Sequence, residues 1–255
     1  MTTPQKKNRR SVVIVGATST VAREIARLCA ADGFDLILAA LEEDELAALA
    51  QDIRVRSSVE VVTLPFDATA FDTHPAFFES CRKALGRLPG GVIVCFGYMT
   101  DQKRTQNDWN ATKLTIDINF TGVVSVLNLF ANAFEERRSG FVAAISSAAG
   151  DRGRQSNYTY GAAKGALTRY LEGLRNRLYH SNVQVTTIKP GFMDTKMTQG
   201  MDLPKPLVAS PEHAAELIWK AIKARKDTVY VIGIWRLIML AVRYVPEVIF
   251  KRMKM

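Results

Sequence analysis

Short apolar runs alternate along the chain with longer segments whose apolar residues recur every three or four positions. The runs cover residues 11–16, 34–40, 59–67, 90–97, 140–147, 183–191 and 228–233. Apolar runs of this length, rich in β-branched residues, are typical of strands buried on both faces of a parallel sheet. Because helical segments separate the runs, we expect right-handed crossovers between the strands. The pattern predicts a single α/β domain with a doubly wound, seven-stranded parallel sheet of the Rossmann type.

Capping residues locate the ends of several helices. Thr18 or Ser19 can cap a helix after the first strand, and Gly33 ends that helix. Ser210 before Pro211 marks the start of a helix at residues 211–226. Further helices are expected at residues 41–53, 72–85 and 107–138, the last as one helix or two, and around Tyr160.

No linker, internal repeat or low-complexity segment divides the chain. Its 255 residues are ample for one domain with a buried core. We expect a basic N-terminal arm at residues 1–10, the Rossmann domain at residues 11–233 and an apolar, basic C-terminal helix at residues 234–255. Residues 193–210 contain two prolines and no sustained period, so we expect a loop there.

The formal net charge is +9, in a chain that is otherwise of ordinary globular composition. This excess could serve nucleic acid, an anionic membrane surface or a phosphorylated ligand, or only keep a basic protein soluble. Three cysteines and three histidines are scattered, so neither a disulfide framework nor a metal site is expected, and a reducing compartment such as the cytoplasm is. The first apolar run is too short for the core of a signal peptide.

The turn after the first strand is a candidate anion site. A strand that runs through a tight turn into a helix presents backbone amides and the positive end of the helix dipole to a ligand. The dinucleotide fingerprint has three glycines in this turn. The chain keeps Gly16, while Thr20 and Ala22 occupy the other two positions.

Cofactor choice is expected to depend on the residues after the second strand. An acid there binds the ribose hydroxyls of NAD, whereas a base suits the 2′-phosphate of NADP. Ala40 and Leu41 are followed by four acidic residues at 42–45, with no base. These carboxylates would repel a 2′-phosphate, which favours NAD(H) and leaves NADP(H) as the alternative. The same acids could instead only stabilise a helix N-terminus.

Tyr160 and Lys164 stand four residues apart in the segment NYTYGAAKGALTR, so they share one helical face. A phenol titrates near ~10, and a neighbouring ammonium group lowers its pKa. Such a pair can donate a proton to a carbonyl oxygen. Alone, the same spacing also fits a half-exposed helix whose lysine reaches solvent.

Together these motifs resemble the classical short-chain dehydrogenase/reductase family from about residue 11 to residue 233. YGAAK is similar to the family's YxxxK motif, Ser147 occupies the place of its catalytic serine, and Asn119 in DINFTG matches its asparagine. The resemblance implies the catalytic set Asn119, Ser147, Tyr160 and Lys164. It also implies a set of cofactor contacts, namely Gly16, Thr18, Ser19, Thr20, Val21, Leu41, Asp67, Phe96, Gly97, Tyr160, Lys164, Pro190, Gly191, Met193 and Thr195.

The resemblance assigns a role to each catalytic residue. Tyr160 would donate its proton to the carbonyl oxygen as hydride arrives from the reduced nicotinamide. Lys164 would lower the phenol's pKa and hold the nicotinamide ribose. Ser147 would donate a hydrogen bond to the developing alkoxide, and Asn119 would hold a water molecule.

The chain departs from the family pattern in two places. Two glycines of the first turn are replaced, which weakens any inference about phosphate geometry. Cys95, Phe96 and Gly97 stand where the family has Asn-Ala-Gly, which removes a side chain that braces the sheet near the adenosine. Neither departure touches the reacting centre.

Four segments resemble a subgroup of reductases that act on a keto-pentose carried by a polyprenyl phosphate: FDATAFDTHP, FGYMTD, SSAAGDRGR and WRLIMLAVRYVPEVIFKRM. The resemblance implies reduction of a ketone to a secondary alcohol in cell-envelope biosynthesis. It also implies a homodimer or homotetramer, or pairing with a flavin oxidase, and no nucleic-acid partner. Two alternatives stay open, namely the same chemistry on a steroid, fatty-acyl or xenobiotic ketone, and a non-catalytic nucleotide-binding scaffold.

Residues 234–250 are nearly all apolar, but they are too short and too interrupted to span a bilayer. On a helix, Arg236, Arg243 and Glu247 would share one narrow stripe, with apolar residues around the rest and a basic flank after them. Such a helix suits the cytoplasmic face of a membrane. It suits equally well a dimer partner or a cover over the substrate pocket.

Overall fold

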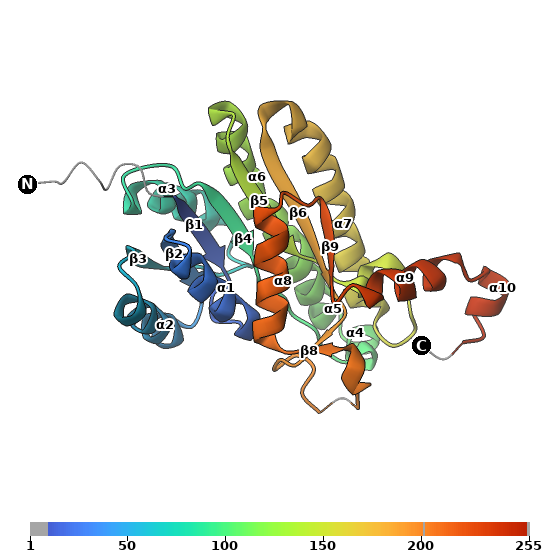
Figure 1. Ribbon diagram of the computed structural model, residues 1–255. Helices are drawn as coiled ribbons and strands as arrows, with labels where there is room; N and C mark the ends of the chain where they lie inside the picture. Colours follow the sequence, from blue (N-terminus) through green and yellow to red (C-terminus); the bar gives the residue numbers. More distant parts are fainter. Residues whose placement is uncertain (1–9, 201, 254–255) are drawn as a thin grey trace, which may run out of the picture.

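Seven parallel strands form the central sheet in the order β3-β2-β1-β4-β5-β6-β9 (Figure 1). The computed structural model describes residues 10–200 and 202–253. The strands are β1 Ser11–Val15, β2 Asp35–Ala40, β3 Val61–Pro65, β4 Gly91–Val94, β5 Gly140–Ile145, β6 Val183–Pro190 and β9 Thr228–Val231. The predicted doubly wound sheet is confirmed. Its strand order reverses between β1 and β4, which places a crevice at the carboxyl ends of the strands.

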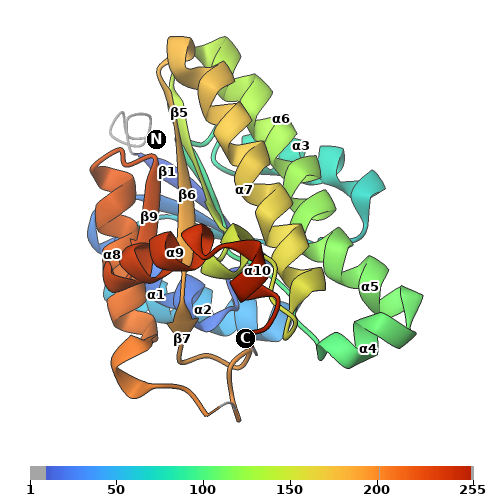
Figure 2. The ribbon, with the colours of Figure 1, turned by 90° about the vertical axis from the view of Figure 1, so that its right-hand side faces the viewer.

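Helices cover both faces of the sheet (Figures 1 and 2). One layer contains α1 Thr20–Ala31, α2 Glu43–Arg56 and α8 Pro211–Lys223, and the other contains α3 His74–Ala84, α6 Gly122–Arg137 and α7 Tyr158–Leu178. Val12 and Ile14 of β1 pack into the first layer, whereas Val13 and Val15 pack into the second. Strand side chains alternate between faces, so a strand with two buried faces must be apolar throughout.

The predicted helix caps are present. Ser19, rather than Thr18, caps α1, and its hydroxyl accepts a hydrogen bond from the Ala22 amide at 3.4 Å. Gly33 has a φ of +77°, which a residue with a side chain rarely adopts. Ser210 caps α8 by accepting from the His213 amide at 3.2 Å. These local contacts fix where each helix enters and leaves the sheet.

The segment between β4 and β5 is more divided than the sequence predicts. It contains α4 Gln102–Asn107, α5 Trp109–Ile116, a π-helical turn Asp117–Thr121 and then α6. The prediction missed α4 because this short polar helix has no apolar period; Asp101 caps it by accepting from the Lys103 amide at 2.7 Å. Residues 109–137 are long and apolar enough to cross a membrane, but Phe130 and Phe134 within them are buried in the core under the sheet.

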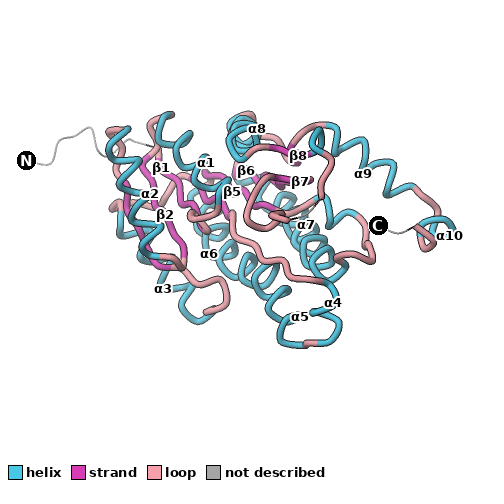
Figure 3. The backbone as a smooth tube through the Cα atoms, turned by 90° about the horizontal axis from the view of Figure 1, so that it is seen from below, coloured by secondary structure: helices cyan, strands magenta, loops and turns pink. Residues whose placement is uncertain are grey.

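Residues 193–210 are not wholly a loop. A short strand β7, Phe192–Met193, pairs in parallel with β8, Val208–Ala209 (Figure 3). Two-residue strands leave too short a pattern for the sequence to reveal them. Their pairing holds the segment beside the carboxyl end of β6.

The C-terminal region forms two helices instead of one. They are α9 Ile234–Tyr244 and α10 Glu247–Phe250, and they extend away from the sheet (Figures 1 and 3). Pro246 explains the break, because the residue before a proline avoids the helical conformation, and Val245 is extended. The predicted basic arm lies outside the described residues except for Arg10, whose guanidinium carbon lies 4.3 Å from the centre of the Phe34 ring.

Candidate active site

A cavity of about 1370 Å³ opens at the carboxyl ends of the central strands. Gly16, Ala40, Cys95, Ile145 and Pro190 line it where β1, β2, β4, β5 and β6 end. The volume exceeds the ~300–1,000 Å³ typical of a site for one small ligand. The cavity therefore has room for a dinucleotide and a second molecule.

All the residues expected to contact a cofactor line this one cavity, together with Ser147. They come from segments as distant in sequence as the first turn, Asp67 after β3 and Thr195 after β7. The fold thus brings the expected nucleotide residues to the same cleft as Ser147, Tyr160 and Lys164, three of the four expected catalytic residues. Their contact with a cofactor remains a prediction.

The first turn has the shape of an anion site despite its missing glycines. Gly16 has a φ of +79°, and a Cβ there would lie 2.6 Å from the backbone nitrogen of Phe96. Phe96 therefore explains why this position must be glycine. Thr20 and Val21 line the cavity with the first turn of α1, whose N–H groups lack helical partners. Ala22 is fully buried and lets α1 pack closely on the sheet.

Asp67 is held in its charged form. Its Oδ1 accepts from the Thr69 amide and from the Thr69 hydroxyl, both at 2.7 Å. These hydrogen bonds lower the pKa of the Asp67 carboxyl below its ordinary value. Together with the α1 N-terminus and the Gly16 turn, this acceptor fits a dinucleotide.

Basic residues from other elements lie near the acidic cluster at residues 42–45. Glu42 accepts a hydrogen bond from the Thr18 hydroxyl at 2.8 Å. Glu45 forms ion pairs with Arg23 of α1 and, at 3.8 Å, with Lys196 after β7. Residues 40–45 contain no base, as the sequence shows, but the fold brings these two bases to the cluster from other elements. The cavity wall therefore carries both acidic and basic side chains at this point. The preference for NAD(H) over NADP(H) stays a prediction.

Three glycines bring the Ser147 turn against α7. The 3-10 turn Ala148–Asp151 follows β5 and Ser147. A Cβ on Gly150 would lie 2.6 Å from the Gly165 nitrogen, and one on Gly161 would lie 2.9 Å from the Ala149 oxygen. Only glycine allows the turn and the helix to approach this closely, which sets Ser147 beside the Tyr160–Lys164 face.

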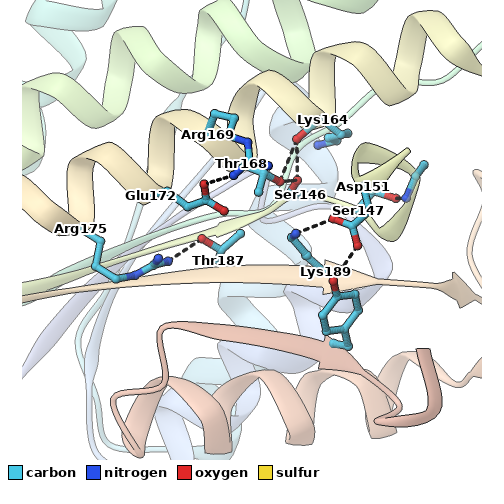
Figure 4. A network of polar contacts seen from close by, with 12 residues as sticks. Ser146, Ser147, Asp151, Lys164, Thr168, Arg169, Glu172, Arg175, Thr187 and Lys189 are labelled. Atoms are coloured by element: carbon cyan, nitrogen blue, oxygen red, sulfur yellow. Dashed lines mark hydrogen bonds and ion pairs between the residues drawn. The ribbon is translucent and has the colours of Figure 1, made fainter. Parts of the chain in front are cut away.

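Ser146 also links the end of β5 to α7. Its hydroxyl donates to the Lys164 carbonyl oxygen at 2.9 Å and lies 2.8 Å from the Thr168 hydroxyl (Figure 4). The Lys164 Nζ donates to the Ile145 carbonyl oxygen at 2.9 Å. The end of β5 and the first turns of α7 are thus joined by both side-chain and backbone groups.

Burial dominates the protonation of the reacting pair. It raises the pKa of Tyr160 to about 12, although a hydrogen bond with Ser147 acts in the opposite direction. It also lowers the pKa of Lys164 to about 7, against a smaller opposing effect of Cys95. The expectation that the phenol's pKa is lowered is therefore wrong, because the effect of burial on the pKa of Tyr160 is the larger one. The same burial that raises the phenol's pKa brings the ammonium group close to neutrality.

Asn119 lies behind the cavity wall rather than on it. It is fully buried in the π-helical turn, and its Nδ2 donates to the carbonyl oxygens of Tyr98 at 2.5 Å and Thr115 at 2.8 Å. Its Oδ1 accepts from the Tyr98 amide at 3.2 Å. A Cβ on Gly97 would lie 3.1 Å from Asn119 Oδ1 and 3.4 Å from Lys164 Nζ. Asn119 therefore fixes the strand-end segment that separates it from the lysine.

Lys189, at the end of β6, belongs to a buried ion pair. Its Nζ lies 2.5 Å from Asp151 Oδ1, and the Tyr230 hydroxyl donates to Asp151 Oδ2 at 2.6 Å (Figure 4). Burial and the adjacent carboxylate raise the pKa of Tyr230. This network ties the Ser147 turn to β6 and β9.

Trp235, Arg154 and Asn157 are among the lining residues that were not expected from the sequence to belong to the site. Trp235 of α9 covers Gly191, where a Cβ would lie 1.9 Å from the indole, and its Nε1 donates to the Leu207 carbonyl oxygen at 3.1 Å. One face of α9 therefore covers part of the pocket, which was one of the three alternatives for the C-terminal segment. No spacing rule marks these residues, because they come from loops and from a helix that packs back onto the site.

Comparison with known proteins shows the family of the chain and relatives of the same fold. Residues 10–205 match the family model described as short chain dehydrogenase. An uncharacterized oxidoreductase of Mycobacterium tuberculosis is 33% identical over 242 residues, which cover 95% of this chain and 96% of that protein. One from Streptomyces coelicolor is 32% identical over 245 residues, covering 96% of each. A short-chain dehydrogenase from Sphingobium yanoikuyae in complex with NADPH shares the fold, with a TM-score of 0.80 at 22% identity over 93% of this chain and 97% of that one.

The family model and the relatives named as oxidoreductases show an enzyme of the oxidoreductase class. The chain belongs to the short-chain dehydrogenase/reductase family.

Proposed function

We propose that the protein uses NADH or NADPH to reduce a ketone to a secondary alcohol. The observation that carries this proposal is the shared cavity, in which Ser147, Tyr160 and Lys164 meet the N-terminus of α1 and Asp67. A bound reduced nicotinamide supplies the hydride. The chain supplies the anion site, the acceptor at Asp67 and the proton donor.

Tyr160 is suited to the acid role. Because burial raises its pKa to about 12, the phenol keeps its proton at neutral pH and can give it to a carbonyl oxygen. The Ser147 hydroxyl lies within hydrogen-bond reach of the phenol and can donate to the same oxygen as negative charge develops there. In the reverse direction, alcohol oxidation, the deprotonated Tyr160 would take the proton back.

For the substrate we propose a keto-pentose on a polyprenyl phosphate carrier. Two segments of the resemblance support this, since both FGYMTD and SSAAGDRGR contribute to the cavity wall. They resemble decaprenylphosphoryl-2-keto-erythro-pentose reductase. The apolar side chains of Phe192, Leu114 and Trp235 on the same wall favour the second candidate, a steroid, fatty-acyl or xenobiotic ketone.

A substrate panel separates these candidates. Loss of the reduced nicotinamide's near-ultraviolet absorbance is followed with a keto-pentose on a short prenyl phosphate, a steroid ketone and a 3-ketoacyl thioester. The proposal predicts the highest kcat/KM for the prenyl-linked sugar. A higher value for either other ketone would assign the second candidate, and dinucleotide binding without turnover of any ketone would indicate a scaffold.

We also propose NADH as the preferred reductant. The Glu42 and Glu45 carboxylates line the cavity just beyond Leu41. A carboxylate there hydrogen-bonds ribose hydroxyls and repels a 2′-phosphate. Glu42→Gln should therefore lower the ratio of kcat/KM for NADH to that for NADPH. An unchanged ratio would show that Glu42 does not determine the choice between NADH and NADPH.

For location we propose the cytoplasm, with peripheral contact to an anionic membrane through α9 and α10. Trp235 and Met239 are buried against the domain, whereas Leu237, Leu240 and Tyr244 are 65%, 51% and 77% exposed. Exposed basic residues accompany this apolar face: Arg236, Arg243, Lys251 and Arg252. A helix that is apolar and basic on its outer face is complementary to an anionic bilayer surface.

Co-sedimentation with vesicles tests the contact. The pair Leu237→Glu and Leu240→Glu should abolish binding to phosphatidylglycerol vesicles, while Leu114→Glu on the exposed side of α5 serves as control. Unchanged sedimentation of the double variant would contradict the proposal. If the double variant instead changes from dimer to monomer on size exclusion, the exposed face of α9 binds a second copy of the chain. A flavin oxidase is the other protein partner that we propose for this face.

A further inference from the structure

We propose that Arg154 and Asn157 form a subsite for an anionic group with an adjacent hydroxyl, as found together in a sugar phosphate ester. The subsite would hold the part of the substrate that does not react. This inference rests on the proposed ketone reduction at Tyr160, and it names the residues that select the substrate.

Both residues lie on the loop that joins the Ser147 turn to α7. The Asn157 amide donates to the Arg154 carbonyl oxygen at 3.2 Å, which closes a tight turn between them. Both side chains line the cavity. This loop follows β5 and lies on the β6 and β9 side through Asp151, whereas the α1 anion site lies at β1. A substrate whose carbonyl group lies at Tyr160 would share the cavity with Arg154, which is on a different segment of the wall from the α1 anion site.

Arg154 has no partner in the described part of the chain. Its Nε is buried without a hydrogen bond, and its guanidinium forms no ion pair there. The nearest carboxylate, Asp151, is already engaged by Lys189 and Tyr230. Burial lowers the pKa of Arg154, yet a guanidinium keeps its charge at any ordinary pH. Arg154 is half-buried, and only its Nε is enclosed without an acceptor. An enclosed donor without an acceptor is costly, and a ligand oxygen at this position would offset that cost.

The neighbouring Arg152, in contrast, has protein partners for its guanidinium. Its guanidinium donates to the carbonyl oxygens of Val242 at 2.7 Å and Val245 at 2.5 Å, and to the Glu247 carboxylate at 2.9 Å. It thereby caps the C-terminal end of α9. Two residues later, Arg154 faces the cavity with none of these bonds.

Asn157 supplies the complementary group. It is the N-cap of α7, where an asparagine oxygen ordinarily accepts a hydrogen bond from the second or third amide of the helix. No such bond forms here, and Asn157 Oδ1 is buried without a partner. An enclosed acceptor and an enclosed guanidinium nitrogen on the same tight turn of the cavity wall match a ligand that carries a hydroxyl donor next to an anionic oxygen.

The other charged residues on this wall are already used. Asp101 is exposed and caps α4. Lys164 Nζ donates to the Ile145 carbonyl oxygen, and Lys196 lies beside Glu45. Of these cations on the described cavity wall, Arg154 is the one without an ion pair or a side-chain hydrogen bond, whereas Lys196 is 86% exposed and lies 3.8 Å from Glu45. A guanidinium binds a phosphate oxygen pair with two parallel hydrogen bonds.

Binding measured without turnover tests the subsite. Isothermal titration of the NADH complex compares geranyl phosphate with geraniol, and the expected preference for the phosphate is about tenfold to hundredfold in Kd. Arg154→Met should remove that preference while leaving the affinity for geraniol unchanged, and Arg154→Lys should restore part of it. The matched control is Arg169→Met, which replaces an exposed arginine of α7.

The outcomes separate the subsite from the proposed reaction. Equal binding of the two probes by wild type, or an unchanged preference in Arg154→Met, overturns the subsite even if ketones are reduced. An Arg154-dependent preference in a protein that reduces no keto sugar supports the subsite and removes the proposed substrate. Competition with inorganic phosphate identifies the source of the anion: displacement at equal affinity supports a subsite for phosphate itself, and weaker displacement supports one for a lipid-linked ester.

Discussion

Replacing Lys164 with methionine should stabilise the protein while abolishing its activity. Lys164 is 2% exposed, and burial lowers its pKa from 10.5 to about 7. Each unit of pKa is worth about 1.4 kcal/mol, so holding this lysine in its native place costs about 5 kcal/mol at pH 7. Methionine has a similar length and carries no charge to desolvate.

The gain is reduced by one lost hydrogen bond. Lys164 Nζ donates to the Ile145 carbonyl oxygen at 2.9 Å, and methionine cannot. A buried acceptor left without a donor costs about 1–3 kcal/mol. We therefore expect Lys164→Met to raise the free energy of unfolding by about 2–4 kcal/mol at pH 7, the difference between the two effects.

The difference should shrink as the pH rises. The folded protein releases the Lys164 proton near pH 7 and the unfolded chain near pH 10.5. Between these values the unfolded state binds more protons, so the wild type gains stability with rising pH and the variant does not. At a pH of about 9.5 most of the penalty on the lysine is gone, and the variant should be no more stable than the wild type.

Urea denaturation at both pH values measures this prediction. Exposed Lys103, which lies on α4, provides the control variant Lys103→Met, whose stability should match the wild type at either pH. If Lys164→Met is less stable than the wild type at pH 7, or if its difference from the wild type does not change with pH, the buried lysine is not the source of strain that the structure indicates.

Three further predictions concern the turn after Ser147. Gly150→Ala places a Cβ 2.6 Å from the Gly165 nitrogen, so we expect kcat to fall about 10²-fold as Ser147 moves from α7, with dinucleotide affinity kept; near-normal kcat would contradict the close packing. Asp151→Asn leaves Lys189 as a buried charge without its partner and should lower the free energy of unfolding by about 3–5 kcal/mol in urea, whereas a smaller loss than about 1 kcal/mol would show that the pair is not buried in solution. Arg152→Met removes the donor to the last carbonyls of α9, so amide hydrogen exchange should accelerate in residues 234–250 but not in β5; protection unchanged throughout would mean that α9 is held by its apolar contacts alone.

Elements with a strong pattern were predictable from the sequence. The seven strands follow from apolar runs that must be buried on both faces, and the caps at Ser19 and Ser210 follow from side-chain chemistry one residue before each helix. The meeting of Tyr160, Ser147 and the first turn in one cavity follows from the strand order, because carboxyl ends of parallel strands share an edge. Local pattern and topology agree at these positions.

Other features depend on contacts between distant segments. The pairing of Arg23 and Lys196 with Glu45 joins three elements, and no spacing in the sequence indicates it. The pKa values at Tyr160 and Lys164 depend on burial, which the four-residue spacing leaves undefined, so the sequence argument gave the wrong sign for the phenol. The break at Pro246 was readable in principle, since a proline disfavours helix in the residue before it.

Transfer of deuterium tests the central claim most directly. The reduced dinucleotide carries the label at the transferred position, and mass spectrometry follows its arrival at the carbinol carbon of the product. Wild type and Tyr158→Phe, which changes an exposed tyrosine two residues away, should incorporate the label at the same rate. Tyr160→Phe should incorporate none while binding the dinucleotide with an unchanged Kd. Incorporation by Tyr160→Phe at the wild-type rate would show that the phenol is not the proton donor.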